Sequence, residues 1–371
     1  MKFTVFSNDL QKALSKIISV VPSKSTLPIL ENILFELTGN TLKMTATDME
    51  MYMGVELAVN GSQDGRIAIP ARRLNETVRA LPNLDLHVAI DQSLNKISVK
   101  TEQGEYKMSG EAADNFPVET RIKGQLALEI DAALLRGIIH KSTFAVSNDE
   151  LRPAMTGLLL QWQGSEIRAV ATDGHRLVKV IQGGMDAAKS PREVIIPAKA
   201  LGLLAKLLDA GLVTVTFAET NVMFEVNEFQ LVSRIIDERY PNYESVIPAD
   251  NDKILTVNRL ALVAAVRRCA LYSNTITNQI RFHLSDSELR ISAEDIDFGG
   301  EAKEQLPCTF TAEPMEIGFN AKYVEDALTH IDSENIEFEF SSPTRAGMIK
   351  PMPQAEQQEV TLLVMPVRLN V

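Results

Sequence analysis

Alternating hydrophobic and polar residues recur along the chain in three segments of similar length. Residues 34–48, 159–173 and 281–295 each contain two alternating runs separated by a short polar stretch. That pattern is typical of a β-hairpin, because successive side chains of a strand point to opposite faces of a sheet. Each segment ends on an aspartate, and these aspartates lie 125 and then 122 residues apart. The spacing indicates an internal repeat, which has to be recognised before the fold can be assigned.

Two further markers recur with a similar spacing. Residues 69–72, 196–199 and 319–322 each close a predicted strand and open a predicted helix, at separations of 127 and 123 residues. Proline stands at two of these junctions, where a helix tolerates it because the first N–H groups have no partner anyway. Phe116-Pro117 and Tyr240-Pro241 lie 124 residues apart. We therefore predict three homologous domains, over residues 1–124, 125–249 and 250–371.

Each repeat contains two helical stretches, each followed by strand-like alternation. The predicted helices lie near residues 8–20, 71–81, 131–145, 198–209, 258–272 and 320–331. Residues 1–6 alternate as a strand does, and residues 115–126 and 241–254 carry the proline, glycine and charge of linkers. Helices on one side of antiparallel sheets make an α+β fold. The doubling within each repeat predicts six similar half-domain units.

Composition narrows the class of protein. Hydrophobic residues make up 45% and charged residues 23% of the 371 residues, as in a soluble globular protein. No apolar run approaches the roughly 20 residues that span a bilayer, and the N-terminus lacks the layout of a signal peptide. Cys269 and Cys308 are the only cysteines, too few for a disulfide framework or a structural zinc site. We expect two core thiols in a cytoplasmic protein without a metal or other cofactor.

The net charge of −12 argues against nucleic-acid binding, because proteins that neutralise phosphates are usually basic. The distribution of charge answers this objection. The six predicted helices together carry +7, which leaves −19 for the rest of the chain. If all six face one side, that side is basic and attracts a phosphate backbone. The alternative is that lysine and arginine are simply good helix formers, and the helix near 320–331, at −1, departs from the trend.

Enzymatic readings find little support in the sequence. Asp173 and His175 are two residues apart on a predicted strand and turn, a spacing that rarely orients a catalytic pair, and no G-x-S-x-G motif is present. Residues 183–190 are similar to a phosphate-binding loop, but Ala188 stands where its second glycine belongs. The sequence has no H-E-x-x-H motif and no cysteine pair for metal catalysis. We therefore predict a protein that is not an enzyme, in which the 173–175 turn supports a binding surface.

Six separate motifs, in order along essentially the whole chain, closely resemble the bacterial DNA polymerase III beta subunit, or beta sliding clamp. They are residues 1–5 (MKFTV), 26–30 (TLPIL), 172–177 (TDGHRL), 240–243 (YPNY), 315–320 (MEIGFN) and 364–369 (VMPVRL). The resemblance implies a processivity factor, a head-to-tail dimer whose six domains close a ring around duplex DNA. Contacts to phosphates alone would suit a protein that slides, because they do not read base sequence.

The resemblance also implies a hydrophobic pocket between the second and third domains. It would receive short motifs from the replicative polymerase, the clamp loader, other polymerases and repair proteins. Methionine and branched aliphatic side chains re-pack around varied apolar anchors, and an extended C-terminal strand can hydrogen-bond a peptide backbone. The matching positions are Met155, Thr172, Gly174, His175, Arg176, Leu177, Pro241, Val246, Leu363, Val364, Met365, Pro366, Val367 and Arg368.

Two departures from the family concern the C-terminus. Val367 stands where the family's last motif commonly has methionine, which is expected to reshape one wall of the pocket. Asn370 and Val371 extend beyond the usual terminal leucine.

For DNA, the resemblance implies contacts from Lys24 and Arg73, and from Asn148 and Arg152 on a loop that contacts DNA in relatives. The aromatic pair of that loop is replaced by Pro153-Ala154, and Asp149 would repel phosphate, which shifts the expected contact to Arg152. The predicted helices add Lys12, Arg267 and Arg268 as cationic candidates.

For the dimer, the first domain of each chain is expected to meet the third domain of the other, with Leu271 and Ile276 as apolar contacts. A scaffold ring that does not bind DNA stays open as an alternative. Ring formation alone would not need basic helices, so their neutralisation separates the two readings.

Overall fold

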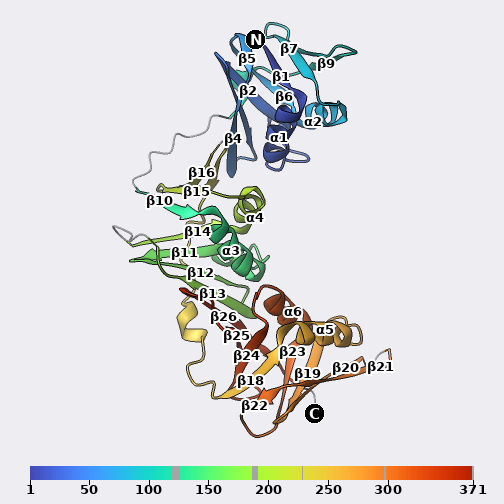
Figure 1. Cartoon of the computed structure of the whole chain (residues 1–371), viewed down its shortest axis with the longest axis vertical. Coiled ribbons are helices and arrows are strands. Elements are labelled where there is room, and N and C mark those ends of the chain that lie inside the picture. The colour runs from blue at the N-terminus through green and yellow to red at the C-terminus, as the bar shows by residue number, and fades with distance from the viewer. Residues whose placement is uncertain (118–125, 186–190, 228, 296–297, 370–371) are drawn as a thin grey trace. The chain divides into compact units, whose positions relative to one another are not determined.

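The computed structural model describes residues 1–117, 126–185, 191–227, 229–295 and 298–369. Its residues form two compact units, shown in chain colours in Figure 1. The first unit contains Met1–Leu134 and Leu203–Ile235, and the second contains Leu135–Gly202 and Ile236–Val371. No helix among the described residues is long and apolar enough to cross a membrane.

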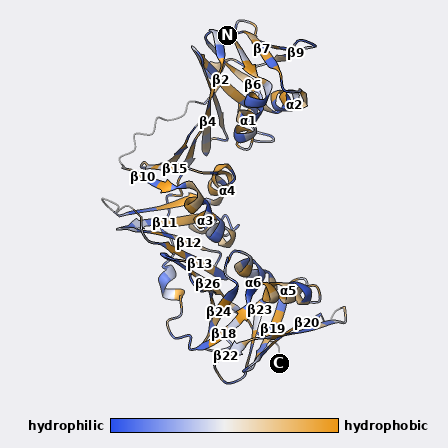
Figure 2. Cartoon of the chain, in the orientation of Figure 1, coloured by the Kyte–Doolittle hydropathy of each residue, from blue (hydrophilic) through white to orange (hydrophobic). Residues whose placement is uncertain are grey.

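Six α-helices lie within the described residues, at the six predicted positions. Their bounds are α1 (Ser7–Ile17), α2 (Ala71–Ala80), α3 (Ala132–Ser142), α4 (Ala198–Leu207), α5 (Arg259–Ala270) and α6 (Ala321–Thr329). In α1 the buried Leu10, Leu14 and Ile17 follow the three-to-four spacing of one helix face. Figure 2 shows hydrophobic and hydrophilic residues side by side on α1, α2 and α5, as expected for helices with one buried face.

The junctions before the second helices differ slightly from the prediction. Pro70 is the N-cap of α2, one residue before the helix begins, and Pro197 likewise ends a strand directly before α4. Asn320 takes the same place before α6, where its side chain accepts a hydrogen bond from the backbone N–H of Lys322 at 3.0 Å. The same position before the helix is thus filled in two ways. Proline has a φ fixed by its ring, whereas asparagine caps the helix with its side chain.

The three predicted hairpins are confirmed as antiparallel pairs. They are β2 (Asn32–Thr38) with β3 (Thr41–Thr47), β11 (Gly157–Gln163) with β12 (Glu166–Thr172), and β19 (Gln279–Leu284) with β20 (Glu288–Asp295). Gly39 and Gly164 turn the first two hairpins with φ values of +57° and +56°, a backbone conformation that glycine adopts without strain.

The first unit contains two antiparallel sheets. The five-stranded sheet has the order β5 (Asn60–Gln63), β1 (Lys2–Phe6), β7 (Asp85–Asp91), β8 (Lys96–Lys100) and β9 (Glu105–Ser109). The eight-stranded sheet has the order β10 (Leu126–Asp131), β15 (Leu212–Phe217), β16 (Asn221–Val226), β17 (Phe229–Arg234), β4 (Met51–Ala58), β3, β2 and β6 (Gly65–Pro70). The pairing of β17 with β4 joins strands of the first and second repeats.

The second unit repeats this arrangement. Its nine-stranded sheet has the order β14 (Arg192–Pro197), β11, β12, β13 (Arg176–Gln182), β26 (Gln358–Val364), β25 (Gly347–Met352), β24 (Asn335–Phe340), β18 (Lys253–Asn258) and β22 (Thr309–Phe310). Its five-stranded sheet has the order β21 (Gly300–Pro307), β20, β19, β23 (Met315–Asn320) and β27 (Pro366–Val367). The pairing of β13 with β26 joins strands of the second and third repeats.

The third repeat has an aromatic core. Phe282, Phe319, Phe338 and Phe340 are buried, and their ring centroids lie 4.5 to 6.3 Å apart. Cys269 is also buried, and burial raises the pKa of its thiol to about 11. Both cysteines are free, Cys308 being partly buried with its pKa also raised by burial. The prediction of a core thiol is confirmed for Cys269, whereas Cys308 is not part of the core.

The predicted linkers have different outcomes. Residues 118–125 lie outside the described residues, so the first linker is not described beyond Pro117. The second, predicted over 241–254, includes the short 3-10 helix η5 (Tyr243–Val246) and the start of β18 at Lys253. Other 3-10 turns are η1 (Pro28–Glu31), η2 (Ala113–Asn115), η3 (Thr143–Ala145) and η4 (Pro153–Thr156).

Candidate functional sites

A groove of about 730 Å³ lies in the second unit, where the second repeat meets the third. Its lining comes from η4, the turn between β12 and β13, the segment that follows Tyr240, the loop at 344–346 and the end of β26. Nine of the fourteen predicted pocket residues line it. They are Met155, Thr172, Gly174, Arg176, Leu177, Pro241, Val246, Leu363 and Met365.

The pairing of β13 with β26 builds one wall of the groove. Leu177 stands opposite Leu363 in this ladder, and the backbone N–H of Met365 donates to the carbonyl of His175 at 2.8 Å. Beneath them lies a buried apolar cluster. Its members are Leu159, Val170, Leu177, Ile195, Tyr240, Tyr243, Ala346 and Leu363. Segments nearly two hundred residues apart in the sequence are thus brought together by strand pairing.

The turn over residues 172–176 is held by its own side chains. The hydroxyl of Thr172 donates to the carbonyl of Arg176 at 2.7 Å and accepts from the N–H of Gly174 at 3.1 Å. One carboxylate oxygen of Asp173 accepts from the N–H groups of His175 and Arg176 at 2.9 and 3.0 Å. Such side-chain bonds to the backbone are typical of Asp and Thr in turns.

Glycine avoids backbone strain at the centre of this turn. Gly174 has a φ of +90°, and a Cβ there would lie 3.1 Å from an Nη atom of Arg152. The contacts of Asp173 also bear on the catalytic reading. Its oxygens are taken by backbone N–H groups and by the Nε of Arg176 at 3.0 Å. It therefore holds the turn and does not orient the ring of His175 as a catalytic dyad would need.

Two tyrosines form the apolar floor on the side of the 240–246 segment. Tyr240 is 6% exposed, and burial raises the pKa of its hydroxyl above the usual value. Tyr243 is buried to a similar degree, donates its hydroxyl to Gln161 at 2.8 Å, and also has a pKa raised by burial. Both rings belong to the buried apolar cluster, and Tyr243 also lines the groove.

Five predicted pocket residues do not line the groove. His175 stacks its ring on Tyr323 at 5.9 Å between centroids, and Val364 is fully buried within β26. Pro366 and Val367 form β27 and pair with β23, and Arg368 follows them. Val367, which was expected to reshape a wall of the pocket, does not line the groove and instead pairs with Gly318 of β23. Residues 370–371 lie outside the described residues.

The groove also has lining residues that the sequence did not predict. They are Asn242, Tyr243, Ser245, Ile247, Pro248, Ala249, Asp250, Thr344, Arg345 and Ala346. Most belong to residues 241–254, the segment predicted as a linker. The Tyr-Pro-Asn-Tyr motif at its start is one of the six motifs that resemble the family. The loop at 344–346 gives no signal in the sequence, since only the pairing of β25 with β26 brings it to the groove.

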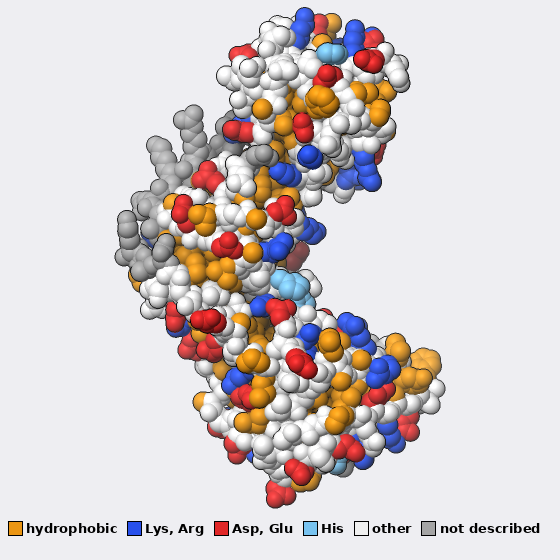
Figure 3. Space-filling model, in the orientation of Figure 1, with side chains coloured by type: hydrophobic (Ala, Val, Ile, Leu, Met, Phe, Trp, Pro, Cys, Tyr) orange, Lys and Arg blue, Asp and Glu red, His pale blue; other side chains and the backbone are white. Residues whose placement is uncertain are grey.

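The predicted DNA contacts fall into two groups. Lys12 on α1, Arg73 on α2, Lys24 and Asn148 are exposed. Arg73 and Lys24 have no ion-pair partner among the described residues, and Lys12 lies 3.8 Å from Asp9. Figure 3 shows Lys and Arg side chains on the surface over α1 and α5. The basic character predicted for the helices is thus present at the surface over both α1 and α5.

The second group is paired with carboxylates of the same unit. The Nε of Arg152 donates to Asp149 at 2.8 Å, and this bond lowers the pKa of Asp149. Arg267 and Arg268 on α5 each donate to a glutamate at 2.7 Å. Carboxylates therefore partly balance the positive charge of these three arginines. This also applies to Arg152, to which the DNA contact of its loop was expected to shift.

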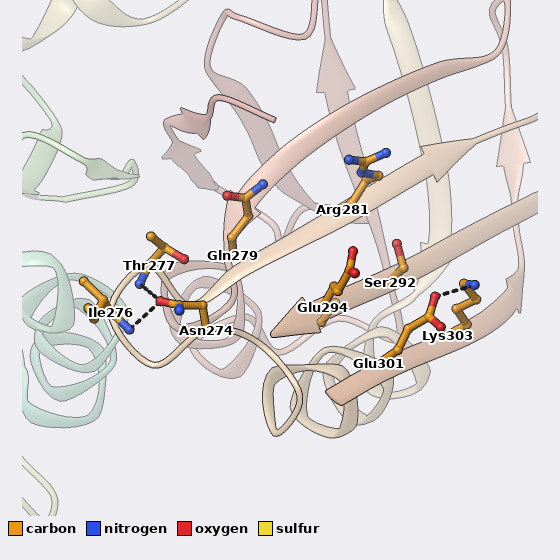
Figure 4. A pocket seen from close by; sticks show the side chains of 10 residues that line it. Asn274, Ile276, Thr277, Gln279, Arg281, Ser292, Glu294, Glu301 and Lys303 are labelled. Atoms are coloured by element: carbon orange, nitrogen blue, oxygen red, sulfur yellow. Dashed lines mark hydrogen bonds and ion pairs between the residues drawn. The ribbon is translucent and has the colours of Figure 1, made fainter. Parts of the chain in front are cut away.

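A second depression lies on the face of β19, β20 and β21, drawn in Figure 4. Glu294 and Glu301 stand directly opposite each other in the strand ladder, and Lys303 pairs with Glu301. Ile276 lies at one end of this face and is 87% exposed. Leu271, the other predicted apolar contact, is 81% exposed. These two residues have no apolar cover within the described chain.

Comparison with known proteins decides the family. Domain profiles described as DNA polymerase III beta subunit N-terminal, central and C-terminal domain match residues 1–120, 129–242 and 244–368. The chain belongs to the DNA polymerase III beta subunit family. The beta sliding clamps of Vibrio cholerae and Pseudomonas aeruginosa are 31% and 32% identical to it over 372 residues, covering 100% of both chains.

Solved structures of this family superimpose on the whole chain. The sliding clamp of Pseudomonas aeruginosa bound to griselimycin has a TM-score of 0.94 at 30% identity, and that of Bartonella birtlesii, also bound to griselimycin, has the same values. The Bacillus subtilis clamp has a TM-score of 0.94 at 27% identity. Each comparison covers 100% of both chains. The fold is thus that of three clamp domains, and the chain is a sliding clamp of DNA polymerase III.

Proposed function

We propose that this sliding clamp closes as a head-to-tail dimeric ring around duplex DNA and holds partner proteins in the groove at residues 172–177 and 363–365. The observation that carries the proposal is the groove itself. Its apolar floor is assembled from two domains, and a methionine and aliphatic side chains stand at its rim. Such a surface suits short apolar motifs of varied sequence.

The partners we propose are the replicative polymerase, the clamp loader, other polymerases and repair proteins. Griselimycin, to which two related clamps are bound in crystals, is proposed as a ligand of the same groove. The role needs no cofactor and no catalysis by this chain. Among the described residues, no group of three His, Cys, Asp or Glu side chains could hold a metal ion. A cytoplasmic location stays a prediction.

For DNA, α2 is the strongest candidate. Its Arg72, Arg73 and Arg79 are exposed and have no ion-pair partner among the described residues. Lys12 and Lys24 extend the cationic set in the same domain, whereas Asn148, Arg152, Arg267 and Arg268 are proposed as weaker contacts. Cations that meet only phosphates would hold DNA without reading its sequence.

For the ring, two open sheet edges support a contact between unlike domains. β9 ends the five-stranded sheet of the first domain, and β21 ends that of the third. Edge strands carry unpaired N–H and C=O groups that can pair with another chain. Near β21, exposed Leu271, Ile276 and Phe298 offer apolar area, and Glu294 has no ion-pair partner among the described residues. Contacts of this heterologous kind give a finite ring when the rotation closes.

The domain boundaries we propose are 124/125 and 249/250. The first falls in the gap between the profile matches that end at 120 and resume at 129, whereas the second lies six residues inside the match that begins at 244. The second boundary also lies between η5 and β18, where the chain leaves the second domain.

The test is retention on DNA of different topology. The clamp is loaded by a clamp loader and ATP onto nicked circular DNA, washed with salt, and half of the sample is then linearised. Electrostatic binding alone falls steeply with salt and does not depend on the cut. We expect the clamp to survive salt on circles and to leave linear DNA. Equal retention on both forms would contradict encirclement, and no retention on either would favour a scaffold ring without DNA.

A further inference from the structure

Arg176 has a set of partners that reaches beyond the groove it lines. It begins β13 and its side chain is only 13% exposed. The groups that bind its guanidinium do not line the groove. Its aliphatic carbons therefore form part of the groove wall, while its guanidinium group binds residues outside the groove.

Three oxygen acceptors surround the guanidinium. The Nε donates to Asp173 at 3.0 Å, one Nη donates to the carboxylate of Asp326, and the other Nη donates to the carbonyl of Phe144 at 2.8 Å. The guanidinium carbon also lies 4.9 Å from the ring centre of Tyr323 and 5.4 Å from that of Phe144. A planar guanidinium bound on all three nitrogens has one orientation, so its stem is fixed as well.

Asp326 differs from the other two acceptors in its origin. Asp173 and Phe144 belong to the second domain, as Arg176 does, whereas Asp326 lies on α6 of the third. Asp326 also stands in the last turn of α6, where the helix dipole disfavours a carboxylate. The pairing with Arg176 offsets this cost, because a hydrogen bond between two charged groups is stronger than a neutral one.

We infer that Asp326 is a positioning residue for ligand binding: it fixes Arg176 in the groove wall and couples α6 of the third domain to the groove. The inference rests on the proposed function, since it assumes that the groove binds partner motifs. The side chain of Asp326 is 45% exposed, and Arg176 keeps two other acceptors when Asp326 is replaced. Its removal should therefore loosen Arg176 without unfolding the turn.

The experiment compares Asp326→Asn with a matched control, Asp332→Asn. Asp332 also lies in the third domain, and it also pairs with a cation of the second, Lys141, at 3.1 Å. The guanidinium of Arg176 has its three oxygen acceptors elsewhere, so Asp332 does not help to orient it. The dissociation constant of fluorescently labelled griselimycin is measured by anisotropy for the full-length clamp and both variants. Thermal unfolding confirms that each variant is folded.

We expect D326N to weaken griselimycin binding on the order of fivefold, because a nearly buried arginine loses one charge-assisted bond. D332N should bind within about twofold of the parent. Asp326→Glu, which keeps the carboxylate, should restore most of the affinity. The ¹⁵Nε signal of Arg176 should shift in D326N and stay in place in D332N.

Two outcomes would overturn the inference. Unchanged binding by D326N would show that Arg176 needs no support from α6. Equal losses in D326N and D332N would show that any ion pair between the two domains has the same, merely structural, effect. A parent clamp that does not bind griselimycin, or that binds it as well after Met365→Ala, would instead reject the proposed groove, and the inference with it.

Discussion

Arg267 on α5 and Glu325 on α6 form an ion pair with 2.7 Å between Nε and a carboxylate oxygen. This contact gives a physical reason for the one predicted helix that departed from the basic trend. Of the two acidic residues of α6, Glu325 binds Arg267 and Asp326 binds Arg176. The helix near 320–331 is acidic because its carboxylates serve as partners, and the charge of α5 is correspondingly reduced.

The first prediction follows from this difference between helices. Replacing Arg72, Arg73 and Arg79 of α2 by glutamine should weaken DNA binding more than replacing Arg267 and Arg268 of α5. The slope of log affinity against log salt should fall by about 0.9 for each phosphate that the variant no longer neutralises. The measurement is a salt titration of duplex binding by fluorescence anisotropy.

The control for that experiment is the dimer. Sedimentation should give the same mass for the α2 variant as for the parent, because the contact proposed on the first domain is the edge strand β9, to which these arginines do not belong. If the slope fell as much in the α5 variant as in the α2 variant, the paired arginines would contribute as much to DNA binding as the unpaired ones. Ion pairing within the chain would then not decide which arginines bind DNA.

The second prediction concerns the rim of the groove. Met365 is 42% exposed and lines the groove, whereas Met352 is 40% exposed and does not. Met365→Ala should weaken griselimycin binding on the order of tenfold, as expected when one apolar side chain no longer packs on a ligand. Met352→Ala removes the same side chain at similar exposure and should leave binding as it was. Isothermal titration calorimetry measures both, and similar losses of affinity would place the ligand elsewhere.

Point substitution is preferable to removing residues 365–371. Deletion should abolish polymerase stimulation, but it also removes β27, which pairs with Gly318 and Phe319 of β23. A truncated clamp that still bound a partner peptide would contradict the proposal that the groove is the binding site. A truncated clamp that failed to bind would leave two explanations, and Met365→Ala separates them.

The repeat explains how much of this fold the sequence could predict. The hairpins, the helices and the three-domain order all follow from the periodicity of hydrophobic and polar residues. The same pattern occurs in each repeat. The equivalence extends to the backbone: the N–H of Arg234 donates to the carbonyl of Glu50 at 2.9 Å, as that of Met365 does to His175 at 2.8 Å. Even the turn geometry recurs, with φ of +76° at Met49 and +90° at Gly174.

What the sequence could not supply is the set of side-chain partners. Arg267 and Arg268 count as free cations when charges are summed along the sequence, and only the fold places Glu325 and Glu304 beside them. The groove shows the same limit. Tyr243 and Leu363 belong to one apolar cluster that the pairing of β13 with β26 brings together from two domains, and the resemblance to the family, not periodicity, pointed to that place.

The third prediction compares two turn glycines. Gly164→Ala should cost about 1 kcal/mol of unfolding free energy, because φ is +56° and no atom lies within 4 Å of the new Cβ. Gly174→Ala should cost about 2 kcal/mol, since φ is +90° and Arg152 must also move. Only the second should weaken griselimycin binding. Urea unfolding and anisotropy test both, and equal effects of the two variants on binding would contradict the role of the 172–176 turn.

The fourth prediction concerns pH. Burial lowers the pKa of His330 below its usual value, and the nearby His140 and Arg176 lower it further, while its bond to the carbonyl of Asp326 acts in the opposite direction. Between the folded pKa and about 6.5, the unfolded chain therefore binds more protons than the folded one. The stability from neutral His330 is present above about pH 6.5 and is lost as pH falls toward the folded value.

His330→Asn should reduce this dependence of stability on pH below about pH 6.5. The substitution also removes the stacking of His330 on Phe144, whose ring centroids lie 4.2 Å apart, so the variant should be less stable at every pH. The informative quantity is therefore the slope of unfolding free energy against pH and not its absolute value. Urea titrations at a series of pH values measure it, and a slope identical to that of the parent would reject the assignment to His330.

The fifth prediction concerns ring closure. Leu271 and Ile276 are more than four-fifths exposed in the single chain, which is unusual for two large apolar side chains so close in sequence. Replacing both by glutamate should remove about 3 to 5 kcal/mol from each proposed interface, and the clamp should sediment as a monomer at micromolar concentration. Leu151, 91% exposed on another loop, provides the control, because Leu151→Glu adds charge without touching the proposed interface.

A monomer in the double variant alone would locate the contact near the end of α5 and β21. The same variant should then fail to remain on circular DNA after loading, because an open chain cannot encircle it, even though the arginines of α2 are unchanged. Retention by a proven monomer would mean that electrostatic contact suffices, whereas a dimer that persists in the double variant would move the interface away from Leu271 and Ile276.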